Sequence, residues 1–144
     1  MATNAYEAYL ESKILTADPV ELVQLLYRAA LDAVRQARIE LRHGRIRERS
    51  RAITRASDIL NELALSVDHS AGGELSRNLV ELYAYMQQSL IDANARQQDP
   101  PLEETERLLA SLVEAWQNCR PDPSLIAGAE YETPAEYTPL SCTY

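Results

Sequence analysis

The sequence predicts an all-α protein, an antiparallel up-down four-helix bundle, on the strength of three observations. Apolar residues recur at spacings of three, four and seven in four segments of the chain. Short stretches rich in glycine, proline or aspartate separate these segments, which favours antiparallel neighbours. No segment alternates polar and apolar residues for long enough to predict a strand. We expect the bundle to span residues 18–120, after a loosely attached N-terminal lead-in over residues 1–17.

The first helix has a well-defined start and end. Pro19 suits the first helical position, with Asp18 as the N-cap and Glu21 at the place from which a capping-box carboxylate reaches back. His43 and Gly44 end the helix, because glycine supplies the left-handed residue that closes a last turn.

Three further apolar patterns predict the remaining helices. The second covers residues 46–67 and is broken by residues 68–73, the third covers residues 75–93, and the fourth follows Asp99-Pro100-Pro101 and covers residues 102–116. Residues 121–144 hold four prolines and three tyrosines, so we expect a mostly disordered C-terminal tail rather than a fifth helix.

Charge is unevenly distributed along the chain. The net charge is −8, yet residues 35–55 hold eight arginines and two glutamates, a local charge of +6 that leaves −14 on the remaining residues. This acidity argues against general nucleic-acid binding, because phosphates would be repelled by most of the surface. The arginines are expected to form a solvated end of the bundle or, alternatively, a docking patch for an acidic protein surface.

The sequence also bears on location. The longest apolar runs are far shorter than the roughly 20 residues of a membrane span, so no membrane insertion is expected. The N-terminus has neither the basic nor the apolar region of a signal peptide. The two cysteines, Cys119 and Cys142, are therefore expected to be reduced thiols in a cytoplasmic protein.

Candidate catalytic and metal-binding motifs are incomplete. A di-iron bundle needs two Glu-x-x-His motifs, and only Glu40 with His43 matches. We interpret Glu40 and His43 as a solvated pair near a helix C-terminus. The four glycines form no phosphate-binding loop, and no nucleophile elbow occurs. We expect no enzyme, no metal and no cofactor.

The first helix has more apolar surface than one core requires. At about 100° per residue its apolar arc exceeds about 150°, against about 100° for an ordinary amphipathic helix. One edge holds Leu22, Leu26, Ala29 and Ala33, and the other holds Val20, Val23, Tyr27, Leu31 and Val34. Either this is the most buried helix, or one edge meets the bundle and the other meets a partner or the lead-in.

The third helix repeats this feature on a smaller scale. Val80, Ala84 and Ile91 lie to one side of its core positions, with Gln87 between them. Such a row either contacts the neighbouring helix or contributes to a groove for a partner helix.

Several motifs in the chain resemble a known family. They are Tyr6-x-x-Tyr9, Thr16-Ala17-Asp18-Pro19-x-Glu21-Leu22 with Leu26-Tyr27, Gly72-Gly73-Glu74-Leu75-x-x-Asn78-Leu79-x-x-Leu82-Tyr83-x-Tyr85-Met86, Leu90-x-x-Ala93-Asn94 and Glu114-Ala115-Trp116. Over about residues 5–118 the sequence resembles the flagellar secretion chaperone family FliS. The chain departs from that family in its tail, which is longer than the family's usual end.

The resemblance implies a function. It implies a cytoplasmic export chaperone that binds the disordered C-terminal segment of flagellin, prevents its premature polymerisation and helps to deliver it to a flagellar export gate protein. It further implies that Tyr6 and the lead-in either cover a groove when no client is bound or dock at the gate. The alternative is a helical interaction or regulatory module that uses its surplus apolar face for homodimerisation. The predicted partner-binding residues are Tyr6, Tyr9, Ile14, Leu22, Val23, Leu26, Tyr27, Leu79, Val80, Tyr83, Ala84, Gln87 and Ile91.

Overall fold

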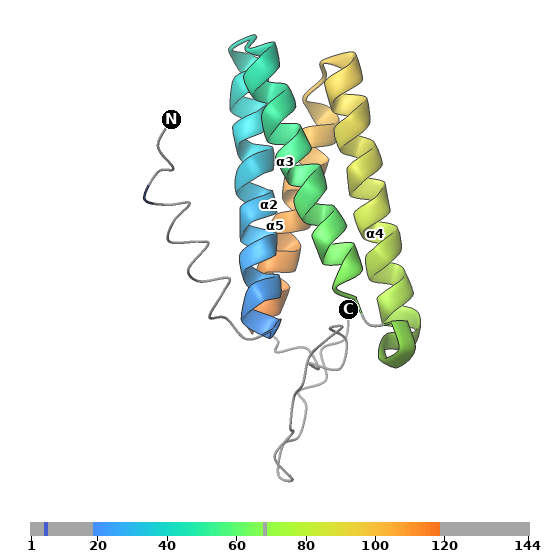
Figure 1. Ribbon diagram of the computed structural model, residues 1–144. Helices are drawn as coiled ribbons and strands as arrows, with labels where there is room; N and C mark the ends of the chain where they lie inside the picture. Colours follow the sequence, from blue (N-terminus) through green and yellow to red (C-terminus); the bar gives the residue numbers. More distant parts are fainter. Residues whose placement is uncertain (1–4, 6–18, 68, 119–144) are drawn as a thin grey trace.

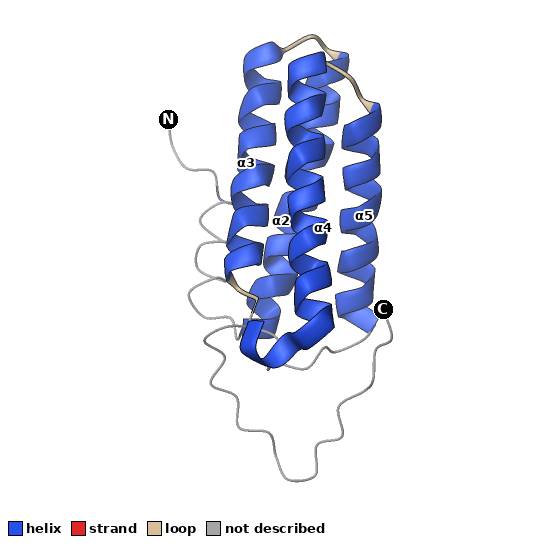
Figure 2. Cartoon of the chain, turned by 90° about the vertical axis from the view of Figure 1, so that its right-hand side faces the viewer, coloured by secondary structure: helices blue, strands red, loops and turns tan. Residues whose placement is uncertain are grey.

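The computed structural model describes residue 5, residues 19–67 and residues 69–118, and the last two ranges form four long α-helices. They are α2 (Pro19–Arg42), α3 (Ile46–Leu65), α4 (His69–Arg96) and α5 (Pro100–Asn118). The helices run alternately up and down and are joined at the two ends of the bundle (Figure 1). In Figure 2, α4 lies in front of α2 with α3 and α5 on either side, so each helix packs against its two neighbours around the bundle. The predicted antiparallel four-helix bundle is confirmed.

Helix α2 begins and ends where the sequence predicts. Pro19 occupies its first position, whereas the expected N-cap, Asp18, lies outside the described residues. At the other end Gly44 has a φ of +67°. The Gly44 N–H bonds to the Leu41 carbonyl at 3.2 Å and the Arg45 N–H to the Glu40 carbonyl at 3.0 Å. These two bonds satisfy carbonyl groups that the last helical turn leaves free.

Helix α4 starts earlier than expected and is kinked. Its apolar pattern predicts a start near residue 75, but α4 begins at His69 and continues through a break at Gly73, whose φ is 54° and ψ is −128°. Glycine tolerates this conformation because it lacks a Cβ. Within α4 the predicted break at residues 68–73 therefore consists of one residue with non-helical backbone angles, Gly73, and a helical turn precedes it.

The core lies along the bundle axis and draws on all four helices. Small residues from α2 (Ala30, Ala33 and Ala37, each at most 3% exposed) let the neighbouring helices approach closely. One apolar residue of the predicted second pattern is not part of it: Ile46 is 57% exposed. Ile46 is the first residue of α3 and therefore lies at the end of the bundle.

Candidate partner-binding surface

The two apolar edges of α2 have different surroundings. One edge is at most 6% exposed and forms part of the core; it consists of Val20, Val23, Tyr27, Leu31 and Val34. On the other edge Leu22 and Leu26 are half-buried. We call Leu22 and Leu26 the α2 row. Because the first edge is enclosed by the bundle, the α2 row is the part of the predicted apolar arc that stays partly accessible, although Leu26 also packs against the core. Outside this row, Ile39 near the end of α2 is 39% exposed.

Several predicted partner-binding residues lie in or against the core. Val23, Tyr27 and Tyr83 are 3%, 0% and 2% exposed, and Leu79 is half-buried and packs against the core. The Tyr27 and Tyr83 hydroxyl groups share a buried hydrogen bond, and the Tyr27 ring meets the Trp116 ring edge-on with centroids 5.6 Å apart. Burial removes these side chains from the surface that a partner can reach in this conformation. Helical periodicity marks apolar edges, but it does not say which edge the other helices will cover.

Helix α4 carries an accessible apolar row on the side that faces α3. Val80 is half-buried, Ala84 is exposed, and Ile91 is 56% exposed. We call these three residues the α4 row. Gln87 lies between them and donates from Nε2 to the Ser57 carbonyl of α3 at 3.1 Å, which fixes this side of α4 toward α3.

Helix α3 lies between the two rows. Ala33 is eleven residues after Leu22 and so shares its face of α2, and it lines a groove of about 340 Å³ between α2 and α3. The α2 row therefore flanks α3 from one side and the α4 row from the other. At the end of α3, Leu65 is 68% exposed. The molecule thus keeps apolar surface on both sides of α3.

Leu65 is not among the predicted partner-binding residues, although its spacing in the sequence indicates that it is exposed. It follows Asp58 by seven residues and Asn61 by four, and both of these are exposed. This spacing places Leu65 on the polar face of α3, where an apolar side chain has no core to join.

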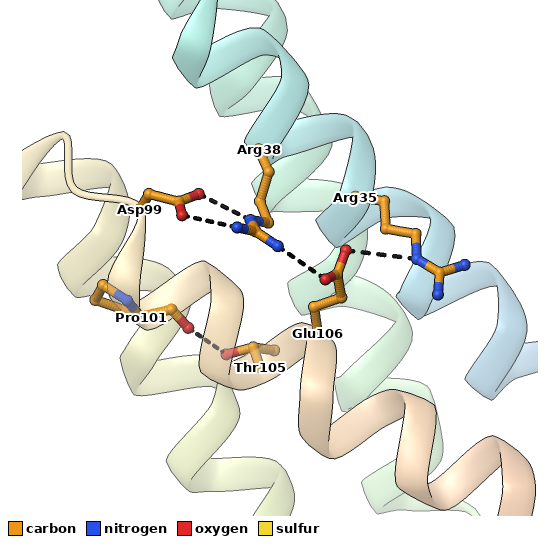
Figure 3. Close-up of polar contacts among 6 residues, drawn as sticks. All are labelled: Arg35, Arg38, Asp99, Pro101, Thr105 and Glu106. Carbon is orange, nitrogen blue, oxygen red and sulfur yellow. Dashed lines mark hydrogen bonds and ion pairs between the residues drawn. The ribbon is translucent and has the colours of Figure 1, made fainter.

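The side of α2 that faces α5 is closed at one end by charged residues. Arg38 donates from Nε and Nη2 to the two carboxylate oxygens of Asp99, and from Nη1 to Glu106, all at 2.8 Å (Figure 3). Arg35 lies 3.4 Å from Glu106. The hydrogen bond and positive charge of Arg38 hold the pKa of Asp99 below its usual value. Hydrogen bonding to Asp99 and its charge raise the pKa of Arg38.

A second groove, of about 560 Å³, lies between α2 and α5. Its lining mixes apolar residues such as Leu25, Ala29 and Val113 with the opposite charges of Arg28 and Glu114. None of the predicted partner-binding residues lines this groove, so it is not part of the candidate surface.

The expected solvated pair of Glu40 and His43 is wrong. Glu40 is 4% exposed, accepts a hydrogen bond from Gln36 Nε2 at 2.8 Å, and lies 3.6 Å from Arg45 Nη1. His43 is exposed, and its Nδ1 lies 2.8 Å from the Ile39 carbonyl oxygen. The turn that ends α2 brings the Arg45 side chain close to Glu40. His43 lies just past the end of α2 and points to solvent.

Two further properties concern only the part of the chain that the structure describes. There, no three histidine, cysteine, aspartate or glutamate side chains are grouped so that they could hold a metal ion. No helix in that part is long and apolar enough to cross a membrane. The predicted partner-binding residues Tyr6, Tyr9 and Ile14 lie outside the described residues, as do both cysteines.

Comparisons with known proteins give a consistent result. The family model of the flagellar protein FliS matches residues 2–123. The flagellar secretion chaperone FliS of Salmonella typhimurium is 36% identical over 116 residues, 80% of this chain and 86% of the relative. The FliS chaperone of Escherichia coli is 32% identical over 126 residues, 86% and 93% of the two chains. The chaperone FliSB of Pseudomonas aeruginosa is 34% identical over 107 residues, 74% and 85% of the two chains.

Proposed function

This chain belongs to the family of the flagellar protein FliS, and we propose that its client is the disordered C-terminal segment of flagellin. Membership establishes a chaperone role in flagellar export, and the family is one of chaperones rather than enzymes. The prediction of a non-enzymatic chaperone is therefore confirmed. In the proposed role the protein acts in the cytoplasm, keeps flagellin from polymerising prematurely and helps to deliver it to an export gate protein.

The observation that carries this proposal is the apolar surface left open on both sides of α3. Leu22 and Leu26 lie on one side, and Val80, Ala84 and Ile91 on the other. A disordered segment that folds as it binds can lay apolar residues against both rows. Covering a side chain the size of Ile91 contributes about 1.5–3 kcal/mol at most, part of which is offset by ordering the client.

The lead-in completes the proposed partner surface. Tyr6, Tyr9 and Ile14 precede the first residue of α2 by 13, 10 and 5 positions, and so belong to the segment that leads into the helix of the α2 row. We assign these three residues to contact with a partner, either by covering the α2 row until flagellin arrives or by docking at the gate. A tyrosine suits either role because its ring is apolar and its hydroxyl remains hydrated.

Mixing the protein with a synthetic flagellin C-terminal segment tests the client assignment. We expect a stoichiometric complex in size-exclusion chromatography and a gain in helical circular dichroism beyond the sum of the two components. A mixture that neither associates nor gains helical signal contradicts the proposal.

A pair of matched variants tests the surface. Ile91→Asp should weaken binding of the flagellin segment about tenfold, because it places a charge in the α4 row. Ile46→Asp is the control, since Ile46 is 57% exposed against 56% for Ile91 but lies outside both rows. Equal losses from the two variants contradict the assignment. If instead Ile91→Asp converts a dimer to a monomer and leaves flagellin binding intact, the α4 row is a homodimer contact.

A further inference from the structure

Three arginines form a continuous exposed stripe on the outer face of α3. Arg47, Arg51 and Arg55 follow one another at intervals of four residues and therefore lie on successive turns of one face. All three are exposed. Within the described residues none of them forms an ion pair. We call these residues the arginine stripe.

Other arginines of the same region already have structural contacts. Arg38 binds Asp99 and Glu106. Arg49 is 4% exposed and donates from Nε to Asn94 Oδ1 at 3.1 Å. These contacts join α2 to α5 and α3 to α4, whereas the arginine stripe joins no two helices. Its three guanidinium groups remain available to a group outside the molecule.

The stripe has a defined length. On the same face of α3 it is followed by Asp58 and Glu62, at spacings of three and four, and both are exposed. The outer face of α3 is therefore positive from Arg47 to Arg55, a length of about 12 Å, and negative beyond Arg55. This change of sign limits the length of the anion that the stripe accepts.

A groove adjoins the stripe. Arg51 and Arg55 line the groove of about 340 Å³ between α2 and α3, together with the amide of Gln36. Ala33 and Ala52, only 3% and 8% exposed, also line it. The small alanine side chains leave a shallow depression beside the guanidinium groups, which gives a bound segment apolar contact as well as charge.

We propose that the arginine stripe and this groove bind an acidic peptide segment of a partner protein, at a site separate from the two apolar rows. The guanidinium group matches a carboxylate with two parallel hydrogen bonds. Glutamates spaced by four residues on a helix repeat at the same interval as the stripe, so one helical segment can engage all three arginines. No residue of the α2 row or the α4 row belongs to the site.

The surrounding charges favour a short acidic peptide over a long polyanion. Asp58 and Glu62 lie at one end of the stripe, and Asp32 and Glu48 line the groove. A nucleic acid or an anionic membrane that extends past Arg55 meets the carboxylates of Asp58 and Glu62, on a protein of net charge −8. A peptide with carboxylates over two helical turns pairs with the three arginines without reaching Asp58 and Glu62, and only Asp32 and Glu48 of the groove remain beside it.

Binding of a designed peptide to the full chain tests the proposal. The probe is an alanine-based helical peptide with glutamate at three positions spaced by four, carrying an uncharged fluorophore; the same peptide with glutamine is its control. The stripe variant is Arg47→Gln/Arg51→Gln/Arg55→Gln. The matched variant is Arg28→Gln/Arg77→Gln/Arg107→Gln, which removes three exposed arginines on α2, α4 and α5 and changes the net charge equally.

In fluorescence anisotropy we expect the glutamate peptide to bind the native chain and the matched variant within about twofold of each other, and the stripe variant about tenfold more weakly. Added salt should weaken binding to the native chain. The stripe variant should retain both its helical circular dichroism and its binding of the flagellin segment. The inference is overturned if the glutamine peptide binds the native chain as tightly as the glutamate peptide, or if the two variants lose the same affinity for the glutamate peptide. It is also overturned if single-stranded DNA or phosphatidylglycerol vesicles bind the stripe more tightly than the peptide does.

Discussion

At the scale of single residues, Asp99 has two roles at the turn between α4 and α5. Its backbone carbonyl accepts the Glu103 N–H at 2.9 Å, which places Asp99 at the start of α5. Its carboxylate accepts two hydrogen bonds from Arg38 of α2, each 2.8 Å long (Figure 3). One residue therefore starts a helix and attaches it to a neighbour, because its backbone and its side chain point to different partners.

The Arg38–Asp99 pair should make stability depend on pH. Arg38 lowers the pKa of Asp99 in the folded state, so the carboxylate favours folding at every pH above its unfolded value of about 3.9. This contribution is lost as the pH falls through the lower folded-state pKa. Asp99→Asn keeps a residue able to cap α5, and it should cost about 1 kcal/mol at neutral pH, since the Asp99 side chain is 35% exposed and screened by water.

Urea unfolding of the native chain and Asp99→Asn at several pH values measures this effect. The two free energies of unfolding should differ at pH 7 and converge below about pH 4. Asp58→Asn is the control because Asp58 is exposed and has no ion pair among the described residues. A difference between Asp99→Asn and the native chain that is constant with pH would show that the ion pair is not its cause.

Tyr27 and Tyr83 mark the limit of sequence-based prediction for single residues. Both fall on apolar helical faces and were predicted to contact a partner, yet their hydroxyl groups bond to each other in the core. A buried tyrosine hydroxyl needs such a bond. The two residues are 56 positions apart and lie on helices that are not adjacent in the bundle. Their contact depends on how all four helices pack, which periodicity within one helix does not encode.

At the scale of the elements, helix ends differ in how plainly the sequence encodes them. Pro19 and Gly44 lie where the sequence predicts a helix to begin or end, whereas α5 begins at Pro100, two residues before its predicted start. The end of α4 has no such residue. There Gln97 adopts a left-handed conformation with a φ of 53°, and the Gln98 N–H reaches the Ala93 carbonyl at 3.2 Å. This bond closes α4 as glycine usually does, with a side chain that disfavours the conformation.

Replacing Gln97 with glycine should therefore stabilise the protein. Glycine removes a left-handed penalty of about 1–2 kcal/mol and adds freedom to the unfolded chain, which leaves a net gain of about 0.5–1 kcal/mol. The measurement is the free energy of unfolding in urea. Gln98→Gly is the matched control, since Gln98 is exposed and does not have a positive φ. It should destabilise the protein slightly. If Gln98→Gly raises the free energy of unfolding, or Gln97→Gly lowers it, the left-handed conformation of Gln97 is not the cause of the effect.

At the scale of the whole molecule, the buried apolar residues lie in the four helices, except for Val67 between α3 and α4. All buried apolar residues of the described core lie between Val20 and Trp116. The sequence predicted the number of helices and their antiparallel order, because spacing and short turns determine them. It left open which edge of α2 meets the core and which arginines stay free, because both depend on neighbours brought together only by packing. The tail lies beyond these boundaries.

Removal of residues 124–144 should leave the chaperone intact. These residues lie past the end of the FliS family match at residue 123 and past the last buried residue of the described core, Trp116. Their deletion removes no described core contact, so the melting temperature and the affinity for the flagellin segment should both be unchanged. A higher affinity after deletion would mean that the tail competes with the client for the apolar rows. A lower melting temperature would mean that it packs on the bundle. The full chain with Tyr131→Ser, Tyr137→Ser and Tyr144→Ser is the control, because it keeps the length and charge of the tail and removes the aromatic rings that either contact requires.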